Sequence, residues 1–309
     1  MYDTVNSWID RAIAGDNPLA IASYLSDVSE TNSQKYGYSV TGKANNYIVR
    51  ASEAGISLKG SLSKFFLNDN IQTLTRSATV QAIEKLSDTL HIPVKEAKIY
   101  RIDISTVFNT KYPPANYYKY LGNKPYFERL LATNNTLYYS TQKRQLIFYD
   151  KQLEAKSTGT NVPDVYTNES LLRYELRFTK RLCEQLKQNE ITGATLSDEH
   201  FYLKLIKLWE AEYFSINKLN GFGKMDVSKI KTRTDAKDAM LTELLQGKDI
   251  NYINEFISDL KAKNINSDPK YYTRLKNDLT ALFKASSTEQ NELITELDKE
   301  VNTVLQYCR

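Results

Sequence analysis

The stretch RQLIFYDKQLE, residues 144–154, is the part of the sequence around which the fold prediction is built. Residues 146–149 are apolar or aromatic throughout, which is typical of a strand buried on both faces. The two-residue period of a strand then predicts that Tyr149 and Lys151 point to the same face. A phenol beside an ammonium is a candidate nucleophile, because the cation favours the phenolate. The alternative is that Tyr149 is one packed ring among 22 tyrosines.

The composition is that of a globular protein with one large domain or two smaller ones, and we expect two. Of the 309 residues, 41% are hydrophobic and 25% are charged, which is ordinary for this class. No apolar run approaches the roughly 18 residues of a membrane span, and the first residues lack the order of a signal peptide. We therefore expect a cytoplasmic protein without membrane contact.

Charge and metal-ligand content restrict the chemistry. The formal net charge is only +4, so any contact with nucleic acid has to come from local basic patches. The two histidines, His91 and His200, lie far apart, and the two cysteines are too few for a thiolate metal site. Carboxylates would have to hold any catalytic metal, which favours a hard cation such as Mg²⁺ or Mn²⁺.

Strands are predicted in the first part of the chain and helices in the last part, from the period of the apolar residues. The predicted strands are Met1–Ile9, Tyr36–Thr41, Tyr47–Ala51, Gly55–Lys59, Ala97–Phe108 and Leu171–Phe178. The predicted helices are Ser77–His91, Lys180–Asn189, Ser197–Lys218, Thr234–Gln246, Ile250–Lys263, Pro269–Lys284 and Thr288–Tyr307, and Ser157–Thr167 is predicted to be a polar loop. The pattern indicates an α+β fold with a central, mainly antiparallel sheet and packed helices, followed by an all-helical C-terminal region.

A composition shift near residues 219–223 indicates a boundary or hinge. We therefore predict a domain at residues 1–225 and a helical region at 226–309. A role in DNA binding or oligomerisation is expected for the helical region.

Three of the predicted strands carry charged groups on one face. Asp103 lies on one strand, Tyr149 and Lys151 on the second, and Glu175 on the third. Two carboxylates on neighbouring strands can hold one divalent cation, which would stabilise charge on a transferring phosphoryl group while Tyr149 attacks phosphorus. The opposing interpretation is a set of Asp–Arg and Glu–Arg pairs that satisfy the charges of the sheet, and the residues alone leave both open.

The chain resembles the replication initiators of filamentous bacteriophages and, more distantly, rolling-circle plasmid initiators of the Rep trans type. The resemblance rests on the order and spacing of several motifs. They are a first strand with Asp3, the segment LKGSLSKFFLNDN at 58–70, RID at 101–103, YDK at 149–151 with Glu154, and RYELR at 173–177. The phage proteins usually carry Gly-His where this chain has Asn68 and Asp69.

The resemblance implies a function and a set of site residues. The protein would nick one DNA strand at a replication origin and keep a 5′-phosphotyrosyl bond until the strand is transferred or closed. The tyrosine of the family falls on Tyr149, with Lys151 beside it. The metal-site acids fall on Asp103 and Glu175, with Asp3 as a third ligand and Glu154 as a weaker candidate.

Candidate DNA contacts are the basic residues near these motifs, namely Lys64, Lys143, Arg144, Arg173 and Arg177. The expected partners are a single-stranded or supercoiled replication origin and the helicase and polymerase of a bacterial host, with a homodimer left open. Two other functions remain: a relaxase or transposase-like nickase of a mobile element, and a DNA-binding protein without catalysis.

Overall fold

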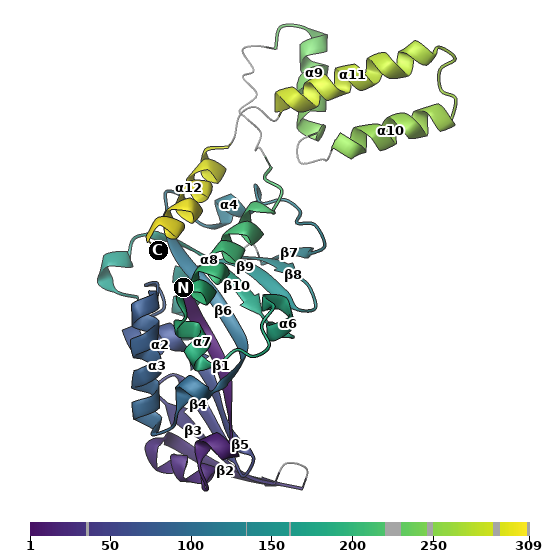
Figure 1. The fold of residues 1–309 in the computed structure, drawn as a ribbon. Coiled ribbons are helices and arrows are strands. Elements are labelled where there is room, and N and C mark those ends of the chain that lie inside the picture. Colours follow the sequence, from purple (N-terminus) through teal and green to yellow (C-terminus); the bar gives the residue numbers. More distant parts are fainter. Residues whose placement is uncertain are drawn as a thin grey trace. The chain divides into compact units, whose positions relative to one another are not determined.

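The computed structural model describes two compact units (Figure 1). It covers residues 1–34, 37–133, 135–160, 162–219, 230–245, 250–286 and 291–307. The first unit comprises Met1–Ala115, Lys124–Ser215 and the end of the chain from Glu300, and the second comprises Asn116–Asn123 and Ile216–Lys299. The predicted domain boundary between residues 225 and 226, and most of the predicted hinge at 219–223, lie outside the described residues.

The first unit contains an antiparallel sheet of ten strands in the order β2-β3-β4-β5-β1-β6-β10-β9-β8-β7. The strands are β1 (Tyr2–Asp10), β2 (Ser26–Ser33), β3 (Gly37–Ala44), β4 (Tyr47–Ser52), β5 (Gly55–Ser61), β6 (Lys98–Thr110), β7 (Glu128–Ala132), β8 (Thr136–Ser140), β9 (Arg144–Asp150) and β10 (Ser170–Phe178). The predicted α+β class with a central antiparallel sheet is confirmed. The strands of interest, β1, β6, β10 and β9, are consecutive neighbours in the middle of this sheet.

One face of the sheet carries the apolar core. Phe148 on β9 and Tyr174 on β10 stack with ring centroids 4.5 Å apart. The Tyr174 ring also lies 4.7 Å from the ring of Trp209 on α8 (Glu199–Phe214). Because side chains alternate along a strand, burying Phe148 and Tyr174 here turns Tyr149, Arg173 and their alternate neighbours to the opposite face.

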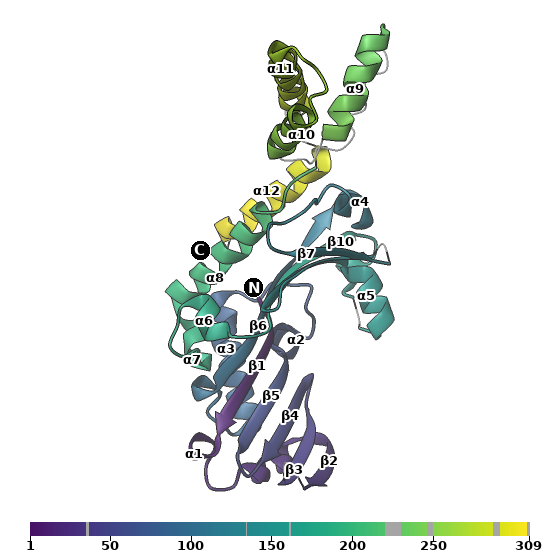
Figure 2. The same cartoon turned by 90° about the vertical axis from the view of Figure 1, so that its right-hand side faces the viewer.

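The remaining helices pack around the sheet or join its strands. In the first unit they are α1 (Arg11–Ala14), α2 (Leu62–Leu67), α3 (Arg76–Leu90), α5 (Lys151–Thr158), α6 (Leu182–Leu186) and α7 (Gly193–Ser197), with 3₁₀ turns at Pro18–Tyr24, Val94–Glu96 and Asp164–Tyr166. Figure 2 shows α5 on one side of the strands and α6, α7 and α8 on the other. No helix among the described residues is long and apolar enough to cross a membrane.

Two predicted segments differ from the structure for local reasons. The predicted helix Ser197–Lys218 is divided at Asp198, whose backbone is extended and whose side chain accepts a hydrogen bond from the Phe201 amide. That carboxylate caps a new helix and ends the previous one. The predicted polar loop Ser157–Thr167 begins inside helix α5, which starts directly after the tyrosine strand.

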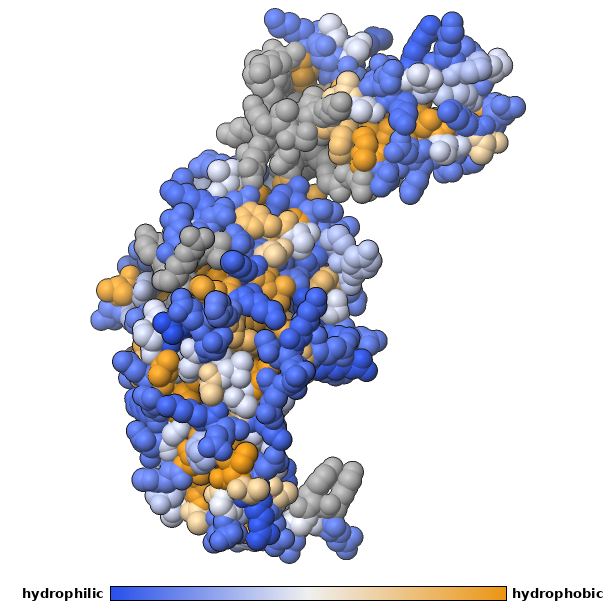
Figure 3. All heavy atoms as spheres, in the orientation of Figure 1, coloured by the Kyte–Doolittle hydropathy of each residue, from blue (hydrophilic) through white to orange (hydrophobic). Residues whose placement is uncertain are grey.

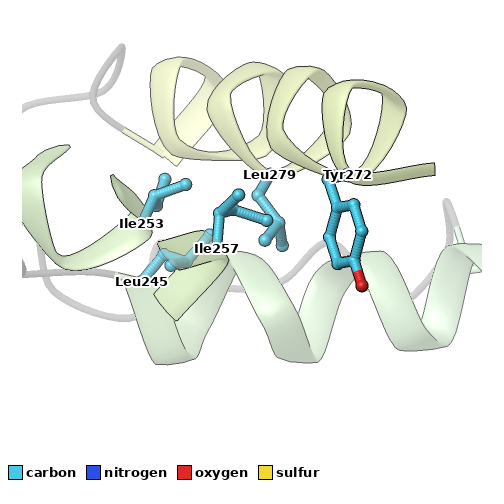
Figure 4. Packing of buried hydrophobic residues seen from close by; sticks show 5 residues of the cluster. All are labelled: Leu245, Ile253, Ile257, Tyr272 and Leu279. Carbon is cyan, nitrogen blue, oxygen red and sulfur yellow. The ribbon is translucent and has the colours of Figure 1, made fainter. Parts of the chain in front are cut away.

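Most of α4 (Ala115–Tyr118) and the first part of α12 (Glu292–Tyr307) belong to the second unit, in which three further helices share a small apolar core. They are α9 (Arg233–Leu245), α10 (Ile250–Ala262) and α11 (Pro269–Ser286). Figure 4 shows how their buried side chains meet, and these are Leu245, Ile253, Ile257, Tyr272 and Leu279. Figure 3 shows apolar side chains also reaching the surface of this unit between polar ones, and Leu244 on α9 is 67% exposed.

Candidate active site

The charged face of the sheet brings together residues from four adjacent strands. On β10, Arg173 lies directly opposite Tyr149 of β9, and Arg177 lies directly opposite Asp103 of β6. Direct cross-strand partners share a face, and Glu175 shares it because it lies between the two arginines in the alternation. Asp103, Tyr149 and Glu175 therefore share one face, with Asp103 in the row of Gln145, four positions along the sheet from the row of Tyr149.

Arg173 is at the centre of this face and is almost fully buried, with a side chain 1% exposed. Its guanidinium donates to the Asp3 carboxylate, to the Ser105 hydroxyl and to the backbone carbonyl of Asn70. Its Nε lies 3.7 Å from Oε2 of Glu175. These contacts tie β1, β6, β10 and the segment after α2 to one cation, so Arg173 fixes the relative positions of the elements that carry the site.

Asp3 is held by hydrogen bonds rather than left open. Its Oδ1 accepts hydrogen bonds from Ser61 and Ser63, and its Oδ2 accepts one from Arg173. Burial alone would raise the pKa of Asp3, but the charge of Arg173 and the two hydroxyls outweigh it and hold the pKa below its usual value. Asp3 is therefore a buried carboxylate that is charged and fully engaged.

Tyr149 is half-buried beside Arg173, whose guanidinium carbon lies 6.0 Å from the ring centroid. Burial raises the pKa of the Tyr149 hydroxyl above its usual value, and Arg173 opposes this increase. The carboxylates of Glu175, Asp3 and Glu154 raise the pKa further. The phenol is therefore protonated at neutral pH. For Tyr149 to react as a nucleophile, a group at the site has to accept this proton or stabilise the phenolate.

Lys151 is not on the tyrosine strand, so the predicted shared face of a strand is wrong. Strand β9 ends at Asp150, whose side chain accepts hydrogen bonds from the Gln152 and Leu153 amides and caps α5. Lys151 is the first residue of that helix, is fully buried, and donates to Oε2 of Glu154 at 2.5 Å. Burial lowers the pKa of Lys151, and the charge of Arg173 lowers it further.

Asp103 and Glu175 are both paired with arginine. Arg101 donates to both carboxylate oxygens of Asp103, at 3.0 and 2.6 Å. Arg177 contacts Oδ2 of Asp103 at 3.2 Å and donates to Oε1 of Glu175 at 2.8 Å. The opposing interpretation of the sequence, ion pairs on a sheet face, is thus also present. Burial raises the pKa of Asp103 to about 7, and Glu175 adds to this increase while the two arginines oppose it.

The donor set suits a hard divalent cation, although it is small. Among the described residues there is no cluster of three or more His, Cys, Asp or Glu side chains placed to hold a metal, so Asp3 does not complete such a group. Asp103 and Glu175 remain as two carboxylates that already share one cation, the Arg177 guanidinium. Mg²⁺ commonly binds to one or two carboxylates, with water and substrate phosphate as the other ligands. The residues present therefore fit this type of site.

The comparison with protein families agrees with the motifs. A phage family model, described as the N-terminal part of a replication-associated protein, matches residues 1–212. The chain belongs to this family. The matched range includes every strand of the sheet and all the candidate site residues. The family predicted from the ordered motifs is confirmed.

Other comparisons are more distant. No curated protein sequence matches this member of the phage replication-associated family significantly. Among solved structures, it is similar to a rolling circle replication initiator protein from Geobacillus stearothermophilus, with 12% sequence identity and a TM-score of 0.40. The match covers 76% of this chain and 89% of that chain.

Of three further predicted DNA contacts of this phage replication-associated family member, two lie away from the central cluster. Arg144 is the first residue of β9, about 17 Å along the strand from Tyr149, and Lys143 directly precedes it. Lys143 pairs with Glu184 and Arg144 with Glu212. Lys64 lies in helix α2, and its Nζ is 3.4 Å from the Thr160 hydroxyl. The charge of Lys64 also lowers the pKa of Lys151, after burial and the charge of Arg173. Lys64 therefore lies near the central cluster, whereas Lys143 and Arg144 lie at the far end of the tyrosine strand.

The family departure at Asn68 and Asp69 has a local explanation. Asn68 ends α2 with φ 65°, in the left-handed region, which glycine favours and which asparagine tolerates better than most residues. Asp69 accepts hydrogen bonds from the Ile71 and Gln72 amides. The chain therefore keeps a left-handed turn after α2 and stabilises the next turn with a carboxylate.

Several residues of the cluster were missed by the sequence prediction. Arg101 pairs with Asp103, and Ser61, Ser63 and Ser105 donate to Asp3 or accept from Arg173. Arg101 could have been found, because it lies two positions before Asp103 and so shares its face of the strand. The serines carry no such signal, since their contacts depend on how β5, β6 and β10 are aligned.

Proposed function

We propose that the protein is a rolling-circle replication initiator that nicks one strand of DNA with Tyr149 as the nucleophile. The observation that carries this proposal is the position of Tyr149, directly opposite the buried Arg173 on the face that also holds Asp103 and Glu175. Membership of a replication-associated family supports a role at an origin.

The chemistry needs no external energy source. The Tyr149 oxygen attacks phosphorus, the bond from phosphorus to the 3′ oxygen breaks, and the phenolic proton is balanced by the proton that this 3′ oxygen takes up. A 5′-phosphotyrosyl bond and a free 3′ hydroxyl result. Because the phosphodiester bond energy is kept in the protein–DNA link, the same step run in reverse on another 3′ hydroxyl transfers or closes the strand.

A divalent metal held by Asp103 and Glu175 would polarise the phosphate and stabilise the charge that develops on it. The protein's own groups position the reactants. Arg173 is too buried to reach DNA; it lies opposite Tyr149 of β9 and pairs with Asp3 of β1 across β6. Arg177 is 29% exposed and can meet a phosphate. Lys64, Lys143 and Arg144 remain proposed contacts for the flanking DNA.

The free 3′ hydroxyl would prime synthesis, so this proposal includes a replication origin as substrate. Host helicase and polymerase are the expected partners, because the nicked strand has to be separated and extended. A cytoplasmic location and a homodimer stay predictions.

The test is formation of a covalent adduct. A labelled single-stranded oligonucleotide carrying the origin is incubated with protein and Mn²⁺, and denaturing electrophoresis detects the adduct. Wild type should form it, and Tyr149→Phe should reduce it by more than about 10³-fold, because the nucleophile is removed. Tyr138→Phe is the matched control, since Tyr138 lies opposite Ile147 on the same face of the sheet.

Each outcome has a distinct meaning. An adduct that persists in Tyr149→Phe but disappears in Tyr138→Phe would move the nucleophile to β8. If the wild-type protein bound DNA but formed no adduct, the result would favour the alternative of a DNA-binding protein without catalysis. An adduct formed only with a transfer or transposon end, and not with a replication origin, would favour the relaxase or transposase-like alternative.

A further inference from the structure

The Arg177 guanidinium lies between the two carboxylates proposed to hold the metal. Its Nε is 3.2 Å from Oδ2 of Asp103, and its Nη2 is 2.8 Å from Oε1 of Glu175. The register explains this position, because Arg177 is directly opposite Asp103 and is two residues from Glu175 on the same face of β10. A single guanidinium therefore bridges acids from two strands.

The second guanidinium at this site comes from Arg101, which holds Asp103 from the strand of Asp103 itself. Both oxygens of Asp103 are thus engaged by arginine. Oε2 of Glu175 accepts no hydrogen bond from the described residues, although the Arg173 Nε lies 3.7 Å away. The pair of acids is neutralised from both sides, with one carboxylate oxygen still available.

The three arginines of this face differ in their freedom to move. Arg173 is 1% exposed and contacts groups on several elements. Arg101 and Arg177 are 30% and 29% exposed, and they donate to carboxylates on this face. Rotation of either side chain toward solvent breaks those pairs without opening the sheet, whereas Arg173 cannot leave without exposing the core of the cluster.

A divalent cation bound to both carboxylates would compete directly with Arg177. A metal ion at these oxygens is repelled by any guanidinium that stays beside them. Arg101 contacts only Asp103, whereas Arg177 contacts both acids and is the arginine that a metal bridging them has to displace from both. Conversely, two buried carboxylates left without any cation carry a large desolvation penalty. Arg177 thus neutralises the two buried carboxylates in the metal-free protein, and it weakens metal binding because the metal has to displace it.

We propose that Arg177 is a resident counter-ion that a divalent metal displaces from Asp103 and Glu175, so that this arginine sets the metal affinity of the site. The inference rests on the proposed function for the identity of the metal ligands. It adds a role for Arg177 as a positioning residue in the metal-free protein, with its guanidinium released toward solvent when the metal binds.

The test measures metal binding without DNA. Full-length protein is stripped with EDTA and dialysed, and Mn²⁺ affinity is measured by electron paramagnetic resonance of the free ion. Arg177→Gln should bind Mn²⁺ about tenfold more tightly than wild type, because the metal no longer has to break two charge-assisted hydrogen bonds. Arg177→Lys should show a smaller increase, since lysine keeps the charge but cannot bridge both acids in a fixed geometry.

Two controls define the site. Arg50→Gln removes the same charge from another strand of the sheet, where Arg50 donates to Ser39, and should leave Mn²⁺ affinity within about twofold of wild type. Asp103→Asn should remove the binding altogether. Thermal unfolding adds a second measurement: Arg177→Gln should be less stable than wild type in EDTA, and should gain more from saturating Mn²⁺.

Equal or weaker Mn²⁺ binding by Arg177→Gln, or tightening of the same size in Arg50→Gln, would overturn the proposal. The proposal would also be overturned if Asp103→Asn failed to remove Mn²⁺ binding both from the wild-type protein and from Arg177→Gln. The adduct assay at saturating Mn²⁺ is scored separately. If Arg177→Gln changes the Mn²⁺ affinity but no adduct forms, the counter-ion role stands and the proposed nicking activity is wrong. If an adduct forms but the Mn²⁺ affinity is unchanged, the nicking activity stands and the counter-ion role is wrong.

Discussion

Arg173 and Asp3 show how individual residues hold this site in place. The two side chains come from strands on either side of β6, and their ion pair is buried. A buried ion pair adds little net stability compared with apolar residues, but removing one partner leaves a buried charge without compensation. We therefore expect the pair to fix the geometry of the face more than to stabilise the fold.

The pair predicts a pH dependence of stability in the metal-free protein. Asp3 has a pKa lowered in the folded state, so its contribution is present above the unfolded pKa of about 4 and is lost as pH falls through the folded pKa. Asp3→Asn should lower the free energy of unfolding by about 3 kcal/mol at pH 7. The difference from wild type should shrink below about pH 4, where Asp3 takes up a proton first in the unfolded chain and, at lower pH, in the folded protein.

Urea unfolding at several pH values in EDTA measures this effect. Asp27→Asn is the control, since Asp27 pairs with Lys43 in an exposed position, and its effect on stability should be small at every pH. If the difference in the free energy of unfolding between Asp3→Asn and wild type stayed constant from pH 7 to below pH 4, the charged state of Asp3 would not be its cause.

At the scale of single residues, alternation along the strands was enough to predict which side chains share the charged face. It placed Arg173, Glu175 and Arg177 on one face of their strand and Asp103 on the face of its own strand opposite Ile102 and Ile104, but left open whether the two strands meet. It could not show which cation meets which acid. Arg177 bridges two carboxylates because of the cross-strand register, which depends on tertiary pairing and is not encoded in either strand alone.

Helix α5 is the element on which the tyrosine most depends. It begins at the residue after Asp150, so the end of β9 and the start of the helix fix the backbone around Tyr149. The helix has a single fully apolar buried residue, Ala155, beside the buried Lys151. With so little apolar surface, its start depends on the cap.

Asp150→Ala should therefore destabilise α5 by about 1 kcal/mol, because the Gln152 and Leu153 amides lose their acceptor. Asp150→Asn is the matched control, since asparagine caps helices about as well as aspartate. Hydrogen exchange of residues 152–158 should accelerate in the alanine variant and stay near wild type in the asparagine variant. Similar exchange in both variants would mean that packing alone holds the helix.

Most elements could be predicted from sequence, and the exceptions have physical causes. Helices α3, α10 and α11 were predicted within a few residues, because their buried residues follow the helical period. Strand β2 was missed, since SDVSETNS has no alternation and is exposed along almost its whole length. It is held by backbone pairing with β3. Helix α5 was missed because its signal is a capping aspartate and not an apolar stripe.

At the scale of the whole molecule, the chain forms two compact units with separate apolar cores. The end of α12, from Glu300, belongs to the same unit as the sheet, so truncation near residue 226 would remove part of that unit as well. A substitution inside the helical unit is the cleaner way to examine the proposed role of residues 226–309 in DNA binding or oligomerisation.

Ile257→Ala should lower the stability of α9, α10 and α11 by about 2–4 kcal/mol, because Ile257 is 4% exposed in their shared core. Hydrogen exchange should accelerate in these helices and not in the sheet. Origin affinity should fall, while adduct formation on a short oligonucleotide should persist. Ile250→Ala is the control on the same helix, since Ile250 is 38% exposed. Faster exchange throughout the sheet would show that the two units unfold together.

The outer strand β2 also bears on how copies of the protein meet one another at high concentration. An edge strand offers its free backbone groups to any other extended chain and can start aggregation. In β2 the pairing with β3 is irregular between Ser26 and Ser29, Asp27 has φ 51°, and Glu30 adds a second negative charge. An irregular, acidic edge resists pairing with a second copy, so this strand works against edge-to-edge aggregation.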